Sequence, residues 1–132
     1  MPDQNPRFEK VPRPESIETL IKYLRSSKVV TDVEKVDEQL IRVERSNGPA
    51  INVFLTNIYI VGEADAIEIL SEHEGIDCIV TMSVWNGYTY SAKTHCSRES
   101  VGLFTFKEFL GAVYRTGQKF LAYGTCESPK QQ

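Results

Sequence analysis

The chain has 132 residues, of which 41% are hydrophobic and 25% are charged, and its formal net charge is −3 at pH 7. This length and composition are typical of one globular domain with its own core. The apolar runs fall well short of the roughly 20 residues that cross a bilayer, and the first residues lack the apolar core of a signal peptide. The sequence therefore predicts a cytoplasmic protein without membrane association.

The cysteines and the charge distribution give further information on the class of protein and its binding partners. Cys78, Cys96 and Cys126 are odd in number and widely spaced, so they indicate reduced thiols and no disulfide framework. Residues 63–77 hold six acidic and no basic residues, whereas residues 78–132 hold six basic against three acidic residues. The net negative charge of the chain does not favour non-specific nucleic-acid binding. A local basic patch could still bind nucleic acid.

The chain begins with a predicted arm and a helix. Four prolines among polar residues indicate an extended arm over residues 1–14. Pro14 suits the first turn of a helix, where the missing N–H costs nothing. Apolar residues then recur at i, i+3, i+4 and i+7, which predicts an amphipathic helix that ends near Ser26.

Three strands are predicted next, rich in apolar and β-branched residues, over residues 29–36, 40–44 and 51–55. A Ser-Asn-Gly-Pro turn separates the last two, so a three-stranded antiparallel meander is expected. Residues 57–61 could extend the third strand past a bulge or begin a separate strand, and both alternatives stay open.

Residues 62–75 predict a second helix with a narrow apolar face of Ala66, Ile67 and Leu70 and with Gly75 as its C-terminal cap. Most of the acidic segment lies on this helix. Such a run is ordinarily the solvated face of an amphipathic helix. The functional alternative is a docking face for a basic partner.

Residues 78–82 are almost continuously apolar, as in a central parallel strand that is covered on both faces. A loop over residues 83–88 follows. Thr89 is a suitable N-cap for a helix that runs to about Cys96, in which Ala92 and Cys96 would face the sheet.

A short strand over residues 101–104 leads to the clearest local signal of the chain. Thr105 and Glu108 have the spacing of a capping box, and Phe104 and Phe109 are placed to form the hydrophobic staple. The apolar stripe of this helix continues to Gly117. Residues 120–123 could add an edge strand, and a polar tail over residues 125–132 ends the chain.

The predicted fold is α/β: a mixed sheet with an N-terminal antiparallel meander followed by strand-helix crossovers, with helices on both faces. Residues 15–124 form its single domain. This order resembles the restriction-endonuclease-like nuclease fold, in particular the methyl-directed restriction and Holliday-junction-resolvase branch. The matching residues are Val80-Thr81, the run from Tyr88 to Ala92, and Gly102-Leu103-Phe104.

The resemblance implies the fold without the usual nuclease site. That family needs an acidic residue on the second strand and an Asp/Glu-x-Lys on the third, which hold Mg²⁺ and activate water. No Lys lies two residues after any Asp or Glu in this chain, and the run from Ile51 to Leu55 has no ionisable side chain. Asp32 and Glu34 share one face of a strand, so a diverged metal site stays open as an alternative.

Other chemistries have weaker support. His73, Cys78, His95, Cys96 and Cys126 show no metal-site spacing, and no Gly-rich nucleotide-binding motif occurs, so neither metal nor cofactor is predicted. A cysteine nucleophile, Cys96 with His73 as its base, would have to be assembled by the fold. No catalytic residue is assigned, and the balance is against an enzyme.

The loop that leaves the buried strand is the one positive signal. In open α/β sheets ligands bind outside the carboxyl ends of parallel strands, and a helix N-terminus attracts anions. The aromatic rings of this loop could stack on a base. The structural alternative is that Trp85 and Tyr88 pack over the sheet edge while Asn-Gly makes the turn. The candidate ligand-binding residues are Trp85, Asn86, Gly87, Tyr88, Thr89 and Lys93.

The leading functional hypothesis is therefore a non-catalytic or diverged nuclease-like domain that acts as a binding module, accessory to nucleic-acid processing or defence. A protein partner or a homodimer is expected. The alternative is a sensor or enzyme that binds a small anionic ligand, such as a nucleotide, through residues 83–93.

Overall fold

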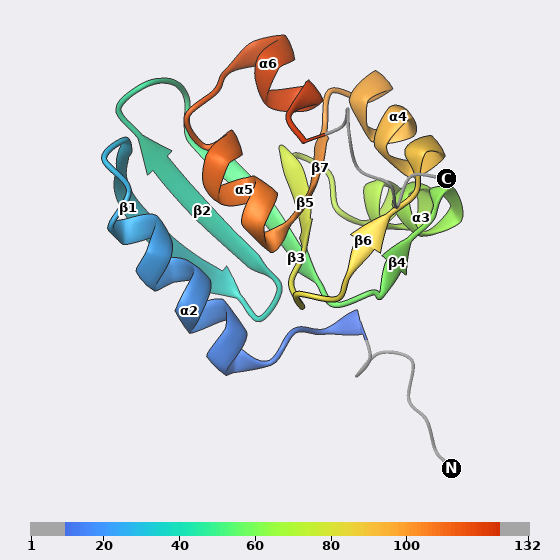
Figure 1. The fold of residues 1–132 in the computed structure, drawn as a ribbon, viewed down its shortest axis with the longest axis horizontal. Coiled ribbons are helices and arrows are strands. Elements are labelled where there is room, and N and C mark those ends of the chain that lie inside the picture. The colour runs from blue at the N-terminus through green and yellow to red at the C-terminus, as the bar shows by residue number, and fades with distance from the viewer. Residues whose placement is uncertain (1–9, 125–132) are drawn as a thin grey trace.

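The computed structural model describes residues 10–124 and has a five-stranded mixed sheet at its centre (Figure 1). The strand order is β1-β2-β3-β5-β7, in which β1, β2 and β3 pair antiparallel and β3, β5 and β7 pair parallel. The predicted α/β fold with an N-terminal meander is confirmed. The strands are β1 (Val30–Asp37), β2 (Leu40–Arg45), β3 (Ile51–Thr56), β5 (Cys78–Thr81) and β7 (Gly102–Thr105).

Helices cover both faces of this sheet and enclose two apolar cores. Helix α2 (Pro14–Arg25), α5 (Phe106–Ala112) and α6 (Gly117–Ala122) lie over one face, and α3 (Glu63–Glu72) and α4 (Tyr90–Arg98) over the other (Figure 1). Strand β5 contributes Cys78 and Val80 to the first core and Ile79 to the second. Its continuous apolarity thus reflects burial on both faces, as predicted.

The question left open at residues 57–61 is settled by a second, small sheet. Strand β4 (Ile60–Val61) pairs parallel with β6 (Gly87–Tyr88). The N–H of Gly87 donates to the carbonyl of Tyr59 at 2.8 Å, and the N–H of Thr89 donates to that of Val61 at 3.0 Å. This pairing anchors the far end of the 83–88 loop.

Helix α3 corrects one part of the predicted core. Ala66 and Ile69 are its buried residues, whereas Ile67 is 47% exposed. Two inward residues three positions apart are enough for this short helix, so the face turns away from Ile67. The helix is capped at His73, and Gly75, at φ +84°, lies two residues beyond that cap.

The predicted edge strand at residues 120–123 is wrong, because residues 120–122 belong to helix α6 and Tyr123 is its C-cap. A four-residue apolar run cannot be assigned to strand or helix by periodicity alone. The helix places Phe120 in the core, with its ring 5.1 Å from that of Phe104. Helix α5 also ends at Ala112, before the predicted Gly117.

Two further observations complete the fold. None of the helices between residues 10 and 124 has the length and apolarity needed to span a bilayer. Residues 1–9 of the predicted arm and the whole predicted tail lie outside the described residues.

The N-cap of α5 yields a stability prediction. The hydroxyl of Thr105 accepts from the N–H of Glu108 at 3.3 Å, and Glu108 Oε1 accepts from the N–H of Thr105 at 3.1 Å. Thr105→Ala should lower the free energy of unfolding by about 1 kcal/mol in urea titrations, because one helix donor loses its acceptor. Thr116, the N-cap of α6, makes no such hydrogen bond. Thr116→Ala should therefore cost less than about 0.5 kcal/mol, and equal losses in both variants would contradict this account.

Candidate functional site

The inner side of the 83–88 loop is held by a buried amide. Asn86 is 4% exposed, and its Nδ2 donates to Thr81 Oγ1 at 2.9 Å and to Asn57 Oδ1 at 3.1 Å. Ser83 Oγ lies 2.8 Å from the same Asn57 oxygen. Asn86 therefore joins the end of β5 to the segment that precedes β4, which is a structural role beyond forming a turn.

The outer side of the loop presents apolar side chains to solvent. Val84 is 81% exposed and Trp85 is 79% exposed, so Trp85 does not pack over the sheet edge. Tyr23, on the neighbouring helix α2, is 54% exposed, and its ring meets that of Phe106 edge to face at 6.2 Å. We call the group made by Tyr23, Val84, Trp85, Phe106 and Leu110 the Trp85 surface.

Two adjoining cavities open at the Trp85 surface, with volumes of about 460 and 580 Å³. They lie between the end of β5, helix α2 and the start of α5. Lys107 is the one charged side chain among the described residues that line them. The lining residues of the two cavities together are Ser16, Thr19, Tyr23, Met82, Ser83, Val84, Trp85, Asn86, Thr105, Phe106, Lys107 and Leu110.

Tyr88 and Lys93 converge inside the domain. Tyr88 is 3% exposed, and its hydroxyl donates toward Glu108 Oε1 at 2.8 Å and the carbonyl oxygen of Gly124 at 3.1 Å. Lys93 is 2% exposed, and its Nζ donates to the carbonyls of Leu103 at 2.6 Å and Tyr123 at 2.8 Å. The sequence thus selected two residues that do meet, but their polar atoms are occupied by the chain itself.

The surroundings of Lys93 disfavour its charge. Burial lowers the pKa of its amine from 10.5 to about 8, and the negative charge of Glu108 acts in the opposite direction. The Nζ atom also lies 4.3 Å from the centre of the Phe104 ring and 5.4 Å from that of Tyr88. Both aromatic faces can stabilise a cation.

The remaining two candidates hold local structure. Gly87 belongs to β6, and Thr89 caps α4 by accepting from the N–H of Ala92 at 3.1 Å. The predicted cap and the inward position of Ala92 and Cys96 are confirmed. Of the six candidate ligand-binding residues, Trp85 is the one that the structure leaves exposed.

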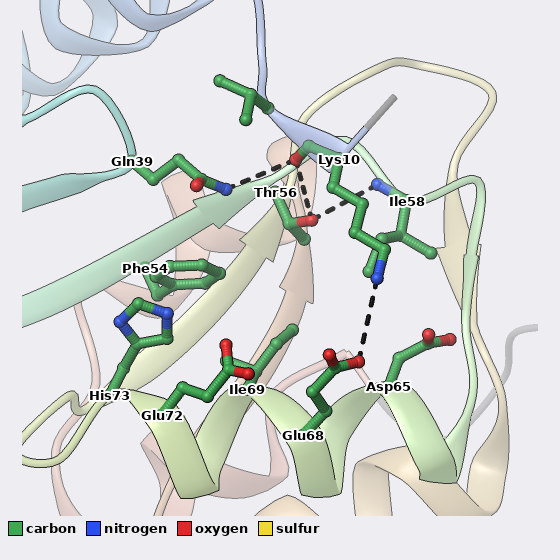
Figure 2. A pocket seen from close by; sticks show the side chains of 11 residues that line it. Lys10, Gln39, Phe54, Thr56, Ile58, Asp65, Glu68, Ile69, Glu72 and His73 are labelled. Carbon is green, nitrogen blue, oxygen red and sulfur yellow. Dashed lines mark hydrogen bonds and ion pairs between the residues drawn. The ribbon is translucent and has the colours of Figure 1, made fainter. Parts of the chain in front are cut away.

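A third cavity, of about 340 Å³, lies between β3 and α3 and was not predicted (Figure 2). The rings of Phe54 and His73 stack at its base, 4.3 Å apart. The carbonyl of Lys10 accepts from Thr56 Oγ1 at 3.1 Å and from the N–H of Asn57 at 2.8 Å, which holds residue 10 against the end of β3. Its lining residues are Lys10, Val11, Gln39, Phe54, Thr56, Ile58, Asp65, Glu68, Ile69, Glu72 and His73.

The acidic segment at residues 63–77 supplies part of the lining of this cavity. Asp65, Glu68 and Glu72 recur at helical spacing, which brings their carboxylates to one side of α3, as Figure 2 shows. Lys10 Nζ lies 3.7 Å from Glu68 Oε1. The helical spacing was readable in the sequence, but the contributions of Lys10 and Gln39 depend on long-range contacts that it does not reveal.

The structure separates Asp32 and Glu34 from the other candidates. Both are exposed on β1, an edge strand, opposite Glu44 and Arg42 of β2. Neither lines the cavities at the Trp85 surface. Among residues 10–124, no three His, Cys, Asp or Glu side chains are grouped as metal ligands.

The two described cysteines have the properties of interior thiols. Cys78 and Cys96 are free and buried. Burial is the main cause that raises the pKa of Cys96 to about 12 and that of Cys78 well above its ordinary value. A nucleophilic thiolate needs a lowered pKa, so neither thiol is prepared for attack.

Comparison with known proteins adds no relative: no family model, no curated protein and no solved structure matches this chain.

The lowered pKa of Lys93 predicts a pH dependence of stability. Between the folded value near 8 and the unfolded value of 10.5, the unfolded chain binds more protons, so the free energy of unfolding rises with pH. The contribution should be about 1 kcal/mol between pH 8 and 9. Lys93→Met retains a long apolar side chain and should lose this contribution.

The measurement is a series of urea titrations of both proteins from pH 7.5 to 9. Cys78 and Cys96 titrate in the opposite sense, because their raised pKa values make the folded chain the stronger proton binder above the unfolded value of 9.0. These thiols are present in both proteins. The difference between the two curves therefore isolates Lys93, and a difference that is independent of pH would contradict the assignment.

Proposed function

We propose that this protein is a non-catalytic binding module of nuclease-like architecture that docks a protein partner through the Trp85 surface. The observation that carries this proposal is a tryptophan, 79% exposed, beside two cavities at the carboxyl end of β5 that are partly lined by apolar side chains. Exposed tryptophan and tyrosine side chains next to pockets have the composition of interface hot spots.

The lining of the cavities indicates the chemistry of the partner. Volumes of about 460 and 580 Å³ can accept one or two large apolar side chains. Lys107 is the one charged side chain among the described residues that line these two cavities, and no carboxylate lines them with it. The complementary segment therefore carries apolar side chains and an adjacent Asp or Glu.

The non-catalytic part of the proposal has separate support. The third strand, where the nucleases that the sequence resembles carry their acid and lysine, contributes Phe54 and Thr56 to the cavity under α3. The remaining acid pair, Asp32 and Glu34, is solvent-exposed on the edge strand, away from the Trp85 surface. A hard cation needs several converging oxygen ligands, which this pair alone does not supply.

The order of elements supports a role beside nucleic-acid processing or defence, since it resembles the order of the restriction-endonuclease-like nuclease fold. In this view the fold serves as a scaffold and the partner supplies the chemistry. Two other occupants compete with a protein partner for the Trp85 surface: a second copy of the chain, and a nucleotide stacked on Trp85. The following experiments distinguish the three occupants.

Peptide selection tests the proposed partner chemistry. A displayed library selected on the wild type and counter-selected on Trp85→Ala should yield apolar peptides with an acidic residue. Trp85→Ala should weaken their binding at least about tenfold, because a hot-spot truncation costs about 2 kcal/mol or more. Tyr114→Ala is the matched control, because Tyr114 is another exposed aromatic residue, beyond the C-terminal end of α5 and outside both cavities.

Three results, from this selection and from two further measurements, would overturn the proposal. Selection without any Trp85-dependent enrichment would remove the peptide site. A Trp85-dependent thermal shift with a nucleotide in place of a peptide would favour the sensor, and concentration-dependent dimerisation abolished by Trp85→Ala would favour a second copy.

Nuclease assays test the non-catalytic part independently. Purified protein with Mg²⁺ or Mn²⁺ should leave DNA and RNA intact, because no described cluster supplies the oxygen ligands and base for hydrolysis. Cleavage by the wild type that disappears in the Asp32→Ala, Glu34→Ala double variant would establish a diverged active site instead.

A further inference from the structure

The amine of Lys93 is bound by main-chain oxygens from two distant segments. Its Nζ lies 2.6 Å from the carbonyl oxygen of Leu103, on β7, and 2.8 Å from that of Tyr123, just after α6. A buried ammonium group ordinarily pairs with a carboxylate, because desolvation of an unpaired charge is costly. Here the chain uses the charge to hold peptide carbonyls.

The hydroxyl of Tyr88 contacts the next carbonyl along the chain. It lies 3.1 Å from the carbonyl oxygen of Gly124 and 2.8 Å from Glu108 Oε1. Lys93 thus binds the carbonyl of Tyr123, and the single hydroxyl proton of Tyr88 is shared between Glu108 Oε1 and the next carbonyl, that of Gly124. Side-chain donors that bind main-chain carbonyls can recognise a peptide independently of much of its sequence, as main-chain hydrogen bonds do in peptide-recognition domains.

The backbone at Gly124 is fitted closely to its surroundings. Its φ of +81° belongs to the left-handed region, and a Cβ atom there would lie 2.6 Å from Glu108 Cδ. The segment is held from the other side by α6, a helix of six residues with Phe120 as its buried residue. Leu121 and Tyr123 are partly buried against the same core, and the hydrogen bonds from Lys93 and Tyr88 fix the carbonyls of residues 123 and 124.

We propose that Tyr88, Lys93 and Glu108 form a binding site for a peptide main chain, and that Tyr123 and Gly124 occupy it as a latch. The charges of Lys93 and Glu108 cancel, which favours neutral carbonyl groups over a phosphate. A peptide segment of a partner that offers successive carbonyls would displace the latch. This site is distinct from the Trp85 surface and does not rest on it.

The test measures how well the latch protects Lys93 from chemical acetylation, followed at each lysine by mass spectrometry. Gly124→Ala in the full chain should raise the acetylation rate of Lys93 about tenfold or more, the ratio that corresponds to a destabilisation of about 1.4 kcal/mol. The exposed Lys119 provides the internal reference. An unchanged rate at Lys93 would show that the segment is not a latch.

Gly75→Ala is the matched control, because Gly75 has a similar φ of +84° but no neighbour within 4 Å of the added Cβ. It imposes the same backbone strain away from the site and should leave the acetylation of Lys93 unchanged. Equal increases in the two glycine variants would assign the effect to general destabilisation and overturn the latch. Tyr88→Phe, which removes the donor to Gly124 without altering the backbone, keeps the test decisive if Gly124→Ala does not fold.

The ligand class is tested by adding a probe to the opened variant. The peptide acetyl-Ala-Tyr-Gly-Thr-amide at millimolar concentration should restore protection of Lys93 in Gly124→Ala, whereas inorganic phosphate should not. Protection by phosphate alone would replace the peptide site with an anion site. Failure of both probes, with Lys93 exposed, would overturn the binding site while leaving the Trp85 surface untouched.

Discussion

Burial of β5 on both faces is the constraint on which the rest of the structure depends. Its four residues are all buried, and three of them, Cys78, Ile79 and Val80, divide between the two apolar cores. A parallel strand in this position needs partners on both edges and helices on both faces. Strands β3 and β7 supply the edges, and the crossover helices α3 and α4 cover one face while α2 and α5 cover the other. The chain leaves β5 at one defined place, so the loop that follows has a fixed origin.

That loop is divided by the same constraint into an inner and an outer side. Polar atoms close to a buried strand end must find partners within the protein. Asn86 meets this need for Thr81 and Asn57, and β6 pairs with β4 just beyond it. Val84 and Trp85, at the tip between these inner contacts, make none of them and project into solvent. The exposed tryptophan is therefore a consequence of where the polar residues of the loop are used.

Local signals made much of this fold predictable from the sequence. The capping box at Thr105 and Glu108, the N-cap at Thr89 and the proline at the start of α2 all depend on residues within one turn of a helix. The rings of Phe104 and Phe109 lie 6.1 Å apart, in keeping with the predicted staple. The predicted strand failed where the local pattern is short: the run at residues 120–123 has four apolar residues, too few to distinguish a strand from the helix in which Phe120 packs on Phe104.

The candidate site was harder to predict, because exposure depends on contacts between segments far apart in the sequence. Lys93 and Trp85 are eight residues apart and both look suited to binding, yet one is 2% and the other 79% exposed. The difference arises from residues 103, 123 and 124, whose carbonyls draw Lys93 and Tyr88 inward. No sequence pattern around Lys93 predicts that its amine binds the carbonyl of Tyr123, thirty positions later. Residue type identified groups able to bind, and the topology decided what they bind.

The two ends of this region consequently have different requirements for function. The Trp85 surface is open in the folded chain and can meet a partner without rearrangement, apart from side-chain rotation. The site at Tyr88 and Lys93 is already filled, so any ligand must displace residues 123 and 124 and overcome their hydrogen bonds. Its apparent affinity is reduced by the small fraction of molecules in which the latch is open. The amine is buried at a pKa near 8, so the folded domain already accepts the desolvation of a cation, and a peptide that replaced the latch would inherit a site prepared for carbonyl oxygens.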